Sequence, residues 1–396
     1  MGPDQELLMA WFHHYYKVQP PRPPSRLERR EFGFMFFDRN FVQRHIGFIS
    51  PGEVPSHVYH STAYYRFPNA STMDEKQWEG ADLIFDLDAD HVKGAEGLTY
   101  EDMLARIKVE LLRLIDDFLL GDLGLDASNL KIVFSGGRGY HIHVSDARIS
   151  QLKSHERREI VDYVSGTDLN MDWVFLERVS AAKSFQGRTQ ESRVRSVPPP
   201  SAGGWRKRMR TGVEWLMEDL RGRDIPDLRT RYPSLAAVPD GVIDGMLRDL
   251  YDRGHGTEGA RLTLDNNVLG YFSDRRHLDL FLMLMDNEVR PRFTSDIDEP
   301  VTSDIKRLIR LPLSLHGKTG LRVVPMSRDE LDRFEPLRDA VPDIYPDTVT
   351  EVFVKGHQEG TLRGQRFDLE GRCEVPLYLA IFLVARRAAT LELPPG

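Results

Sequence analysis

Acidic residues follow directly on an apolar run in the stretch FDLDAD at residues 85–90. Alternate side chains of a β-strand share a face, so Asp86 and Asp88 are expected to point the same way with their carboxylates close together. A divalent cation removes the cost of that like-charge pair, and Mg²⁺ and Mn²⁺ prefer all-oxygen ligands. The alternative is a strand that ends in acids where the chain returns to water, and D-x-D alone does not decide between the two.

A glycine-rich segment, SGGRGYHIH at residues 135–143, combines several unusual choices. Its glycines permit tight turns whose N–H groups can converge on an anion. Arg138 offers a planar fork of donors for phosphate oxygens, and Ser135 can donate another hydrogen bond. His141 and His143 stand two positions apart in the strand that follows, and either one of them or both can line the site. A plain glycine hairpin with an exposed arginine is the alternative.

A third set of residues surrounds the stretch IRLPLSLHGKTG at residues 309–320. Its cations can hold a triphosphate and are Arg310, His316 and Lys318. Asp298 or Asp304 can supply a further metal ligand. GKTG is not a P-loop, because no glycine stands at the required upstream position. A polar turn that joins two strands is the alternative.

The elements around these residues alternate between strand and helix. Residues 82–86 and 130–134 are rich in apolar side chains and predict buried strands. Between them, Thr99 is typical of a helix N-cap, and apolar residues then recur at helical spacing until Gly121. A strand-helix-strand unit normally gives neighbouring parallel strands with the helix on one face.

The predicted fold class is α/β (α+β), with a split catalytic domain built on a central mixed sheet flanked by helices, and a helical insertion subdomain. Charged, helix-length segments indicate the insertion, and Val375 to Arg387 predicts a buried helix that begins near Pro376. The expected parts are catalytic 1–149, insertion 150–287, catalytic 288–345 and a C-terminal segment 346–396 that packs on the catalytic domain.

Composition limits the class of protein. At 396 residues with 40% hydrophobic side chains, the chain can bury a large core and would ordinarily divide into two or three domains. The apolar run Val375 to Ala385 is too short to span a bilayer and the N-terminus lacks a signal-peptide pattern, which predicts a cytoplasmic protein without membrane contact. Cys373 is the only cysteine, so neither an intramolecular disulfide nor a cysteine-based structural zinc site is expected. Any metal must rest on carboxylates and histidines.

The formal charge of −8 argues against a protein that coats nucleic acid over its whole surface. Contacts with a polyanion would have to be local. Residues 188–210 hold seven arginines and lysines against the single acid Glu191. A solvated loop and a template-contacting strip both fit this stretch, and the sequence leaves the two open.

The three sets, in this order, resemble the small catalytic subunit of the archaeal and eukaryotic DNA primases. That family carries a D-x-D on a strand, then an S-G-x-R-G-x-H segment, then a distant aspartate followed by a basic residue and an S-x-H turn. Asp86 and Asp88 match the paired metal ligands of the family. Ser135, Arg138 and His141 match its nucleotide-contacting segment.

The distant members of the pattern match by spacing. Counting back from His316 puts the third aspartate of the family on Asp298 and its basic residue on Arg310, which makes Asp304 the less favoured ligand. The N-terminal signature R-E-F-x-F is present at residues 30–34, and Arg44 occupies roughly the place of a further nucleotide-binding arginine.

The resemblance covers about residues 30–325, and the matching residues are concentrated in the motifs. Many relatives have a structural zinc site built mainly from cysteines, which this chain cannot form with Cys373 alone. The resemblance implies DNA-directed primer synthesis, with two Mg²⁺ or Mn²⁺ ions held by Asp86, Asp88 and Asp298. The residues it implies for the incoming triphosphate are Ser135, Arg138, His141, Arg310 and His316, with Lys318 and Arg44 as further candidates.

The resemblance also implies partners: a single-stranded DNA template, nucleoside triphosphates and a primase large subunit that forms a heterodimer and is expected to bind through the helical insertion. Two other classes of function stay open. A metal-dependent hydrolase or nucleotide-sugar transferase would turn over without a template. A non-catalytic nucleic-acid-binding subunit would keep the fold and bind neither metal nor triphosphate.

Overall fold

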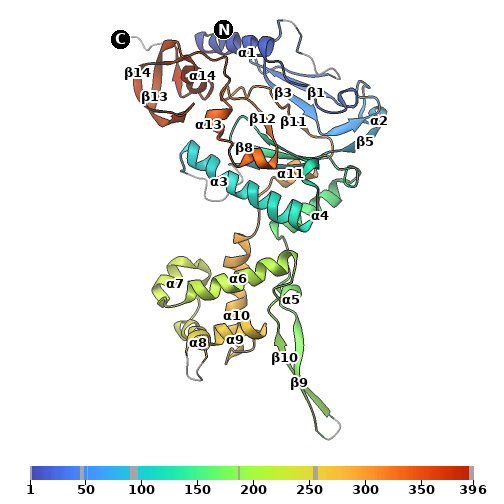
Figure 1. The fold of residues 1–396 in the computed structure, drawn as a ribbon, viewed down its shortest axis with the longest axis vertical. Coiled ribbons are helices and arrows are strands. Elements are labelled where there is room, and N and C mark those ends of the chain that lie inside the picture. The colour runs from blue at the N-terminus through green and yellow to red at the C-terminus, as the bar shows by residue number, and fades with distance from the viewer. Residues whose placement is uncertain are drawn as a thin grey trace. The chain divides into compact units, whose positions relative to one another are not determined.

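The computed structural model describes residues 2–44, 49–50, 52–89, 97–185, 188–252 and 257–391 (Figure 1). The chain divides into two compact units. Unit 1 consists of Met1–Leu120, Gly124–Val161 and Asp296–Gly396, and unit 2 consists of Gly121–Leu123 and Asp162–Ser295. Segments far apart in the sequence therefore build unit 1. The bounds of the four parts given above stay predictions.

The described part of unit 1 contains two four-stranded sheets. The first has the order β11 (Leu308–Arg310), β3 (Pro55–Ser61), β1 (Phe32–Phe36) and β2 (Phe41–Arg44). The second has the order β12 (Val324–Met326), β7 (Leu130–Phe134), β8 (Gly139–Val144) and β6 (Leu83–Asp88). Smaller sheets pair β4 (Ala63–Tyr65) with β5 (Trp78–Ala81), and β13 (Val349–Leu362) with β14 (Gln365–Pro376) and β15 (Ala389–Thr390).

Helices surround these sheets. They are α1 (Pro3–Val18), α2 (Met73–Lys76), α3 (Tyr100–Arg113), α4 (Ser154–Ser165), α11 (Glu299–Ser303), α12 (Arg328–Leu331), α13 (Pro336–Asp339) and α14 (Leu377–Ala385). Unit 2 holds α5 (Met171–Val174), α6 (Gly204–Leu220), α7 (Ile225–Arg231), α8 (Asp240–Tyr251), α9 (Gly259–Asn266), α10 (Arg275–Leu284) and the hairpin of β9 (Glu177–Phe185) and β10 (Arg188–Arg195). This combination of helices with antiparallel sheets confirms the α+β class.

Two helix starts predicted from the sequence agree with the structure. The Thr99 side chain accepts the Asp102 N–H at 3.1 Å and caps α3, and α14 begins directly after Pro376. None of the helices in the described part of the chain combines the length and the apolar character that crossing a bilayer requires.

The prediction of neighbouring parallel strands is wrong. Strands β6 and β7 lie in one sheet with the same direction, but β8 stands between them and pairs antiparallel with both. The reason is the tight turn at residues 135–138, which reverses the chain so that β8 takes the place beside β6. Every pairing in the described ranges is antiparallel, so this central sheet is not mixed.

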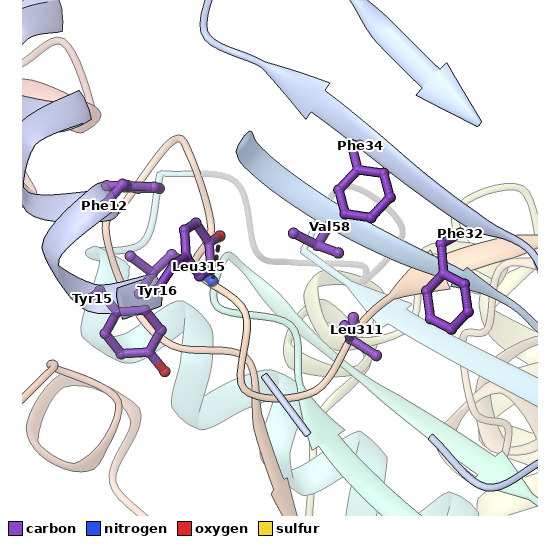
Figure 2. Close-up of a cluster of buried hydrophobic side chains, with 8 residues drawn as sticks. All are labelled: Phe12, Tyr15, Tyr16, Phe32, Phe34, Val58, Leu311 and Leu315. Carbon is purple, nitrogen blue, oxygen red and sulfur yellow. Dashed lines mark hydrogen bonds between the residues drawn. The ribbon is translucent and has the colours of Figure 1, made fainter. Parts of the chain in front are cut away.

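A cluster of large apolar side chains fixes α1 against the first sheet. Figure 2 shows its members, Phe12, Tyr15, Tyr16, Phe32, Phe34, Val58, Leu311 and Leu315. Burying each such side chain stabilises the fold by about 1.5–3 kcal/mol. The Tyr15 hydroxyl also donates to the Leu313 carbonyl at 2.9 Å, and the Leu315 N–H donates to the Tyr16 hydroxyl at 3.2 Å. Helix α1 thereby holds the turn that follows β11.

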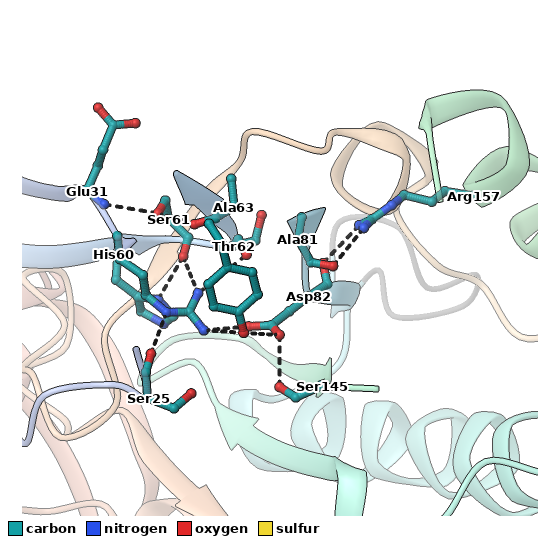
Figure 3. A network of polar contacts seen from close by, with 12 residues as sticks. Ser25, Glu31, His60, Ser61, Thr62, Ala63, Ala81, Asp82, Ser145 and Arg157 are labelled. Carbon is teal, nitrogen blue, oxygen red and sulfur yellow. Dashed lines mark hydrogen bonds and ion pairs between the residues drawn. The ribbon is translucent and has the colours of Figure 1, made fainter. Parts of the chain in front are cut away.

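A buried polar network ties the first sheet to the strand that enters β6 (Figure 3). The Arg30 and Asp82 side chains are only 2% and 4% exposed and form an ion pair at 2.7 Å. The hydroxyls of Tyr64 and Ser145 also donate to Asp82, at 2.6 and 2.9 Å. Burial alone would raise the pKa of Asp82, but Arg30 and the hydrogen bond from Tyr64 hold it below its usual value. The arginine of the R-E-F-x-F signature is thus a structural residue in this network.

Candidate active site

The two acids of the D-x-D pair lie on one face of β6. Asp86 and Asp88 are partly exposed, whereas Leu87 between them is fully buried. The strand pairs with β8 so that Asp86 is opposite His141 and Asp88 is opposite Gly139. The predicted alternation therefore holds in the structure. Asp90 lies outside the described residues.

A third acid reaches this face from far along the chain. The Asp298 N–H donates to the Asp86 carbonyl at 3.0 Å, and the Asp298 side chain caps α11 by accepting the Val301 N–H at 3.4 Å. Val301 packs with Ile84 and Ile309, which presses α11 against β6 and β11. The backbones of the two segments are thus held together beside the D-x-D pair.

The acids share one electrostatic environment. Burial raises the pKa of Asp86 to about 7, and the charges of Asp88 and Asp298 push it in the same direction against the opposing Arg310. The Arg138 guanidinium lies 3.6 Å from an Asp88 carboxylate oxygen. Among the residues that the structure describes, there is no group of three or more histidine, cysteine, aspartate or glutamate side chains close enough together to hold a metal ion. The like charges of Asp86, Asp88 and Asp298 therefore act on one another at this face of β6.

The glycine loop is packed tightly against its neighbours. Gly136 has φ 73°, and a Cβ there would lie 2.8 Å from the Cβ of His316. A Cβ on Gly139 would lie 2.1 Å from the Leu87 carbonyl oxygen, inside the strand that carries both acids. Side chains are therefore excluded at these two positions by close packing.

Hydrogen bonds fix the same loop from two sides. The Thr319 hydroxyl donates to the Gly136 carbonyl at 2.5 Å, and the Tyr100 hydroxyl donates to the Gly137 carbonyl at 2.5 Å. The Gly137 N–H in turn donates to the Ser135 hydroxyl at 3.3 Å. Helix α3 and the turn after β11 thus hold the segment that presents Arg138.

Two histidines are buried beside the acids and the loop. His141 Nε2 lies 3.5 Å from an Asp86 carboxylate oxygen, and the His316 ring makes an edge contact with His57 at 4.9 Å between centroids. Burial, together with the charge of Arg310, holds the pKa of both His141 and His316 well below 6.5. Both rings are therefore neutral at pH 7. His143 stacks with another buried ring instead and lines no described cavity.

These residues border a cavity of about 700 Å³, the first cavity. Its lining consists of Arg39, Asp88, Tyr100, Ser135, Gly137, Arg138, Arg310, His316, Lys318, Thr319, Ala385, Arg386 and Arg387. Six of these are arginines or lysines and one is an acid, which suits a polyphosphate with its terminal oxygens among guanidinium and ammonium groups.

The structure brings together most of the predicted residues. The first cavity is lined by Asp88 and by five of the other predicted residues, Ser135, Arg138, Arg310, His316 and Lys318. Asp86 lies on the same face of β6 as Asp88, and both His141 and Asp298 contact Asp86. Arg44 is not brought to the cavity. It forms an ion pair with Glu53 at 2.7 Å and lies over the Phe34 ring.

In the basic stretch, residues 188–195 form β10 and residues 204–210 begin α6, and residues 196–203 connect the two. Part of its charge is used inside unit 2. Arg208 pairs with Asp122 at 2.5 Å, and Arg210 donates to the Pro198 carbonyl at 2.8 Å. A role of this stretch in template contact stays a prediction.

Sequence reasoning missed four polar side chains that line the first cavity, namely Arg39, Tyr100, Arg386 and Arg387. Arg386 lies with its guanidinium 4.2 Å from the centre of the Tyr100 ring. Helix α14 and the turn after β1 bring these arginines to the cavity through tertiary packing. No periodicity or short motif in the sequence signals that these arginines reach the cavity.

Comparison with known proteins identifies the family of this chain. A family model described as DNA primase small subunit matches residues 85–328. The chain is similar to a protein from Methanocella arvoryzae named DNA primase small subunit PriS, with 39% identity over 401 residues that cover 96% of this chain and 97% of that protein. Proteins of the same name from Methanococcoides burtonii and Picrophilus torridus are 38% and 35% identical, again over 96% of this chain and 97% and 96% of theirs.

Proposed function

Because this chain belongs to the DNA primase small-subunit family, we propose that it joins nucleoside triphosphates into a primer on a single-stranded DNA template. The observation that carries the proposal is the hydrogen bond from the Asp298 N–H to the Asp86 carbonyl. It places an acid from a distant segment beside the D-x-D pair, at the edge of a cavity rich in cations. Phosphoryl transfer depends mainly on such positioning and charge neutralisation.

The donor set fits Mg²⁺ or Mn²⁺. Asp86, Asp88 and Asp298 would hold two such ions, because three carboxylates offer the hard oxygen ligands that these cations prefer and need positive charge to relieve their mutual repulsion. When bound, the ions would activate the attacking 3′-hydroxyl and stabilise the leaving pyrophosphate.

The chain's own residues would hold the triphosphate. Arg138, Arg310 and Lys318 would neutralise its oxygens, and the hydroxyl of Ser135 would add a hydrogen bond. His316 and His141 would act as neutral hydrogen-bonding groups, since burial keeps their rings uncharged at pH 7. The fixed glycine loop would present Arg138 in one orientation before the substrate arrives.

A large subunit is proposed as the partner, since the relatives are named as small subunits. Unit 2 supports this with large apolar side chains that are unusually exposed. Trp173 is 73% exposed, and Leu176 and Val179 near it in the sequence are 42% and 50% exposed. Such apolar surface is typical of protein interfaces. We place the large subunit of a heterodimer on this part of the insertion.

The proposal is tested by incorporation of labelled nucleotides with and without single-stranded DNA, using the chain together with its large subunit in Mg²⁺ or Mn²⁺. Template-dependent products support it. Turnover of triphosphates at the same rate without DNA would instead indicate a hydrolase or transferase. Absence of both turnover and triphosphate binding would indicate a non-catalytic subunit.

A further inference from the structure

Two aromatic rings and an arginine build part of the wall of the first cavity. The Arg386 guanidinium lies 4.2 Å from the centre of the Tyr100 ring and 5.0 Å from the centre of the Phe382 ring. The two ring centres are 6.1 Å apart. Tyr100 belongs to the first turn of α3, and the other two residues belong to the end of α14. The wall thus joins two distant segments of unit 1.

The backbone that carries Arg386 is fixed by the end of α14. The Arg386 N–H donates to the Phe382 carbonyl at 3.2 Å, and the Arg387 N–H donates to the Val384 carbonyl at 2.9 Å. Arg387 has φ 62°, the left-handed conformation that commonly ends a helix. Ordering a long side chain on binding costs free energy. Because Arg386 is already held by its backbone and by two rings, less of this cost remains when a ligand arrives.

The charge of Arg386 has no counter-ion in the described part of the chain, where this residue forms no ion pair. Desolvation and the nearby charge of Arg138 lower the pKa of the Arg386 guanidinium, and Tyr100 opposes them. Arg138 in turn lies 3.6 Å from an Asp88 carboxylate oxygen. Arg138 therefore has both an acid and a second cation as neighbours. Two like charges beside one cavity favour an anion between them.

A stacked guanidinium keeps its hydrogen-bonding edge available. Aromatic rings contact the flat face of the group, whereas its N–H donors point outward in the plane. The Arg386 side chain donates no hydrogen bond to another residue that the structure describes. Its planar fork can therefore bind two oxygens of one phosphate in the cavity that it lines.

The order of charges along the cavity indicates which phosphate this is. Under the proposed function the α-phosphate lies by Asp86 and Asp88, because the new bond forms there. Arg310 acts on the charge of Asp86 and so lies near the acids, and Arg138 is beside Asp88. The β- and γ-phosphates extend away from the acids, so the cation that comes after Arg138 meets the end of the triphosphate. That cation is Arg386.

We propose that Arg386 binds the γ-phosphate of the incoming nucleoside triphosphate and thereby makes the site prefer triphosphates to diphosphates. Tyr100 is then a positioning residue whose ring holds the guanidinium. The inference rests on the proposed function, which supplies the direction of the triphosphate. Arg386 lies outside residues 85–328, the segment that the family model matches.

The first experiment compares ATP with ADP. Equilibrium dialysis of each labelled nucleotide with the full chain in Mg²⁺ measures the two dissociation constants. Arg386→Gln should weaken ATP binding at least about tenfold, the loss expected for one charge-assisted contact, and change ADP binding by less than about twofold. Equal weakening of ATP and ADP, or binding of ATP as tight as in the wild type, would overturn the inference.

Two further variants provide the controls. Arg386→Lys keeps the positive charge but loses the planar fork, so its preference for ATP should lie between those of the wild type and Arg386→Gln. Arg366→Gln changes an arginine that lines a neighbouring cavity of about 330 Å³, which Arg386 also lines, but not the first cavity. It should bind both nucleotides as the wild type does. Loss of the ATP preference in Arg366→Gln would place the phosphate in the neighbouring cavity and contradict the inference.

The ring and the hydroxyl of Tyr100 can be tested separately. Tyr100→Phe keeps the ring beside Arg386 and removes the hydrogen bond to the Gly137 carbonyl, so ATP and ADP binding should weaken by the same factor. Tyr100→Leu also removes the ring, and the preference for ATP should fall about threefold further, as expected for one cation–π contact. An equal preference in the two variants would show that the ring does not hold Arg386 in place.

Nucleotide incorporation separates this inference from the proposed function. With the large subunit and a primed thymine template, Arg386→Gln should raise the KM for ATP about tenfold and leave kcat nearly unchanged, because the γ-phosphate contact exists before and during the reaction. An unchanged KM beside normal wild-type incorporation would overturn the inference and leave the proposed function standing. If the wild-type chain incorporates no nucleotide, the proposed function fails, and the comparison of ATP with ADP still tests the phosphate contact.

Discussion

The glycine loop and the acid cluster meet at one site but are stabilised in different ways. The loop is complete in the protein alone, with its carbonyls bound by Thr319 and Tyr100 and its glycines packed against His316 and Leu87. The acids have a fixed backbone, but their side chains stay in mutual repulsion. Under the proposed function, the fold alone would position the triphosphate, whereas the carboxylates would take up their final arrangement only with cations bound.

The largest effect is expected from the acids. Asp86→Asn should slow nucleotide incorporation about a thousandfold, because metal-dependent charge stabilisation contributes several kcal/mol to such reactions. The fold should persist, since the change removes a repelled charge, and circular dichroism with thermal melting checks this. Asp304→Asn is the matched control. It changes an acid at the other end of α11 whose carboxylate accepts the Lys306 N–H. Equal loss in both variants would contradict the assignment of Asp86.

The next effect links the two regions. Gly139→Ala would force a Cβ to within 2.1 Å of the Leu87 carbonyl, so β6 and β8 must separate. We expect the free energy of unfolding to fall by about 3 kcal/mol, as for other severe packing conflicts, and incorporation to fall with it. Urea titration measures the first. Gly241→Ala is the control, because a Cβ there meets nothing within 4 Å. Tolerance of Gly139→Ala would show that the strand pairing is looser than described.

The buried histidines of β8 predict a pH effect on stability. Burial lowers the pKa of His143 to about 4 from its usual 6.5. The unfolded chain therefore takes up the proton first as pH falls. The part of the free energy of unfolding that depends on a neutral His143 is complete above pH 6.5 and is lost between pH 6.5 and 4. Urea titrations at pH 7 and pH 5 should differ by roughly 2 kcal/mol. His143→Asn should reduce that difference, and an unchanged difference would contradict the description of His143.

The smallest effect sharpens the account of the loop. Tyr100→Phe removes the hydrogen bond to the Gly137 carbonyl, so the KM for nucleotide should rise about fivefold, with a smaller change in kcat. Tyr140→Phe is the matched control, because that buried hydroxyl has no hydrogen-bond partner among the described residues. If the two variants behave alike, Tyr100 has no special part in holding the loop.

Local patterns in the sequence predicted local structure. The shared face of Asp86 and Asp88, the cap at Thr99 and the start of α14 each follow from a few neighbouring residues. The place of β8 between β6 and β7 did not follow, because strand order depends on a turn whose direction only tertiary packing decides.

The candidate site divides in the same way. The cations that line the first cavity were found where they belong to a compact motif, as Arg138 and Lys318 do. Arg44 matches the family pattern only roughly in position and pairs with Glu53 away from the cavity, whereas Arg39 reaches the cavity from the neighbouring turn. Arg387 enters from the end of the chain. Such residues are recognised only once the fold brings them together.

The most direct test of the central claim is a crystal of the chain soaked with Mn²⁺ and a nucleoside triphosphate, with the manganese located by anomalous scattering. The account predicts manganese bound by oxygens of Asp86, Asp88 and Asp298, with the triphosphate in the first cavity against Arg138. Manganese bound without Asp298, or a triphosphate held away from the glycine loop, would contradict it.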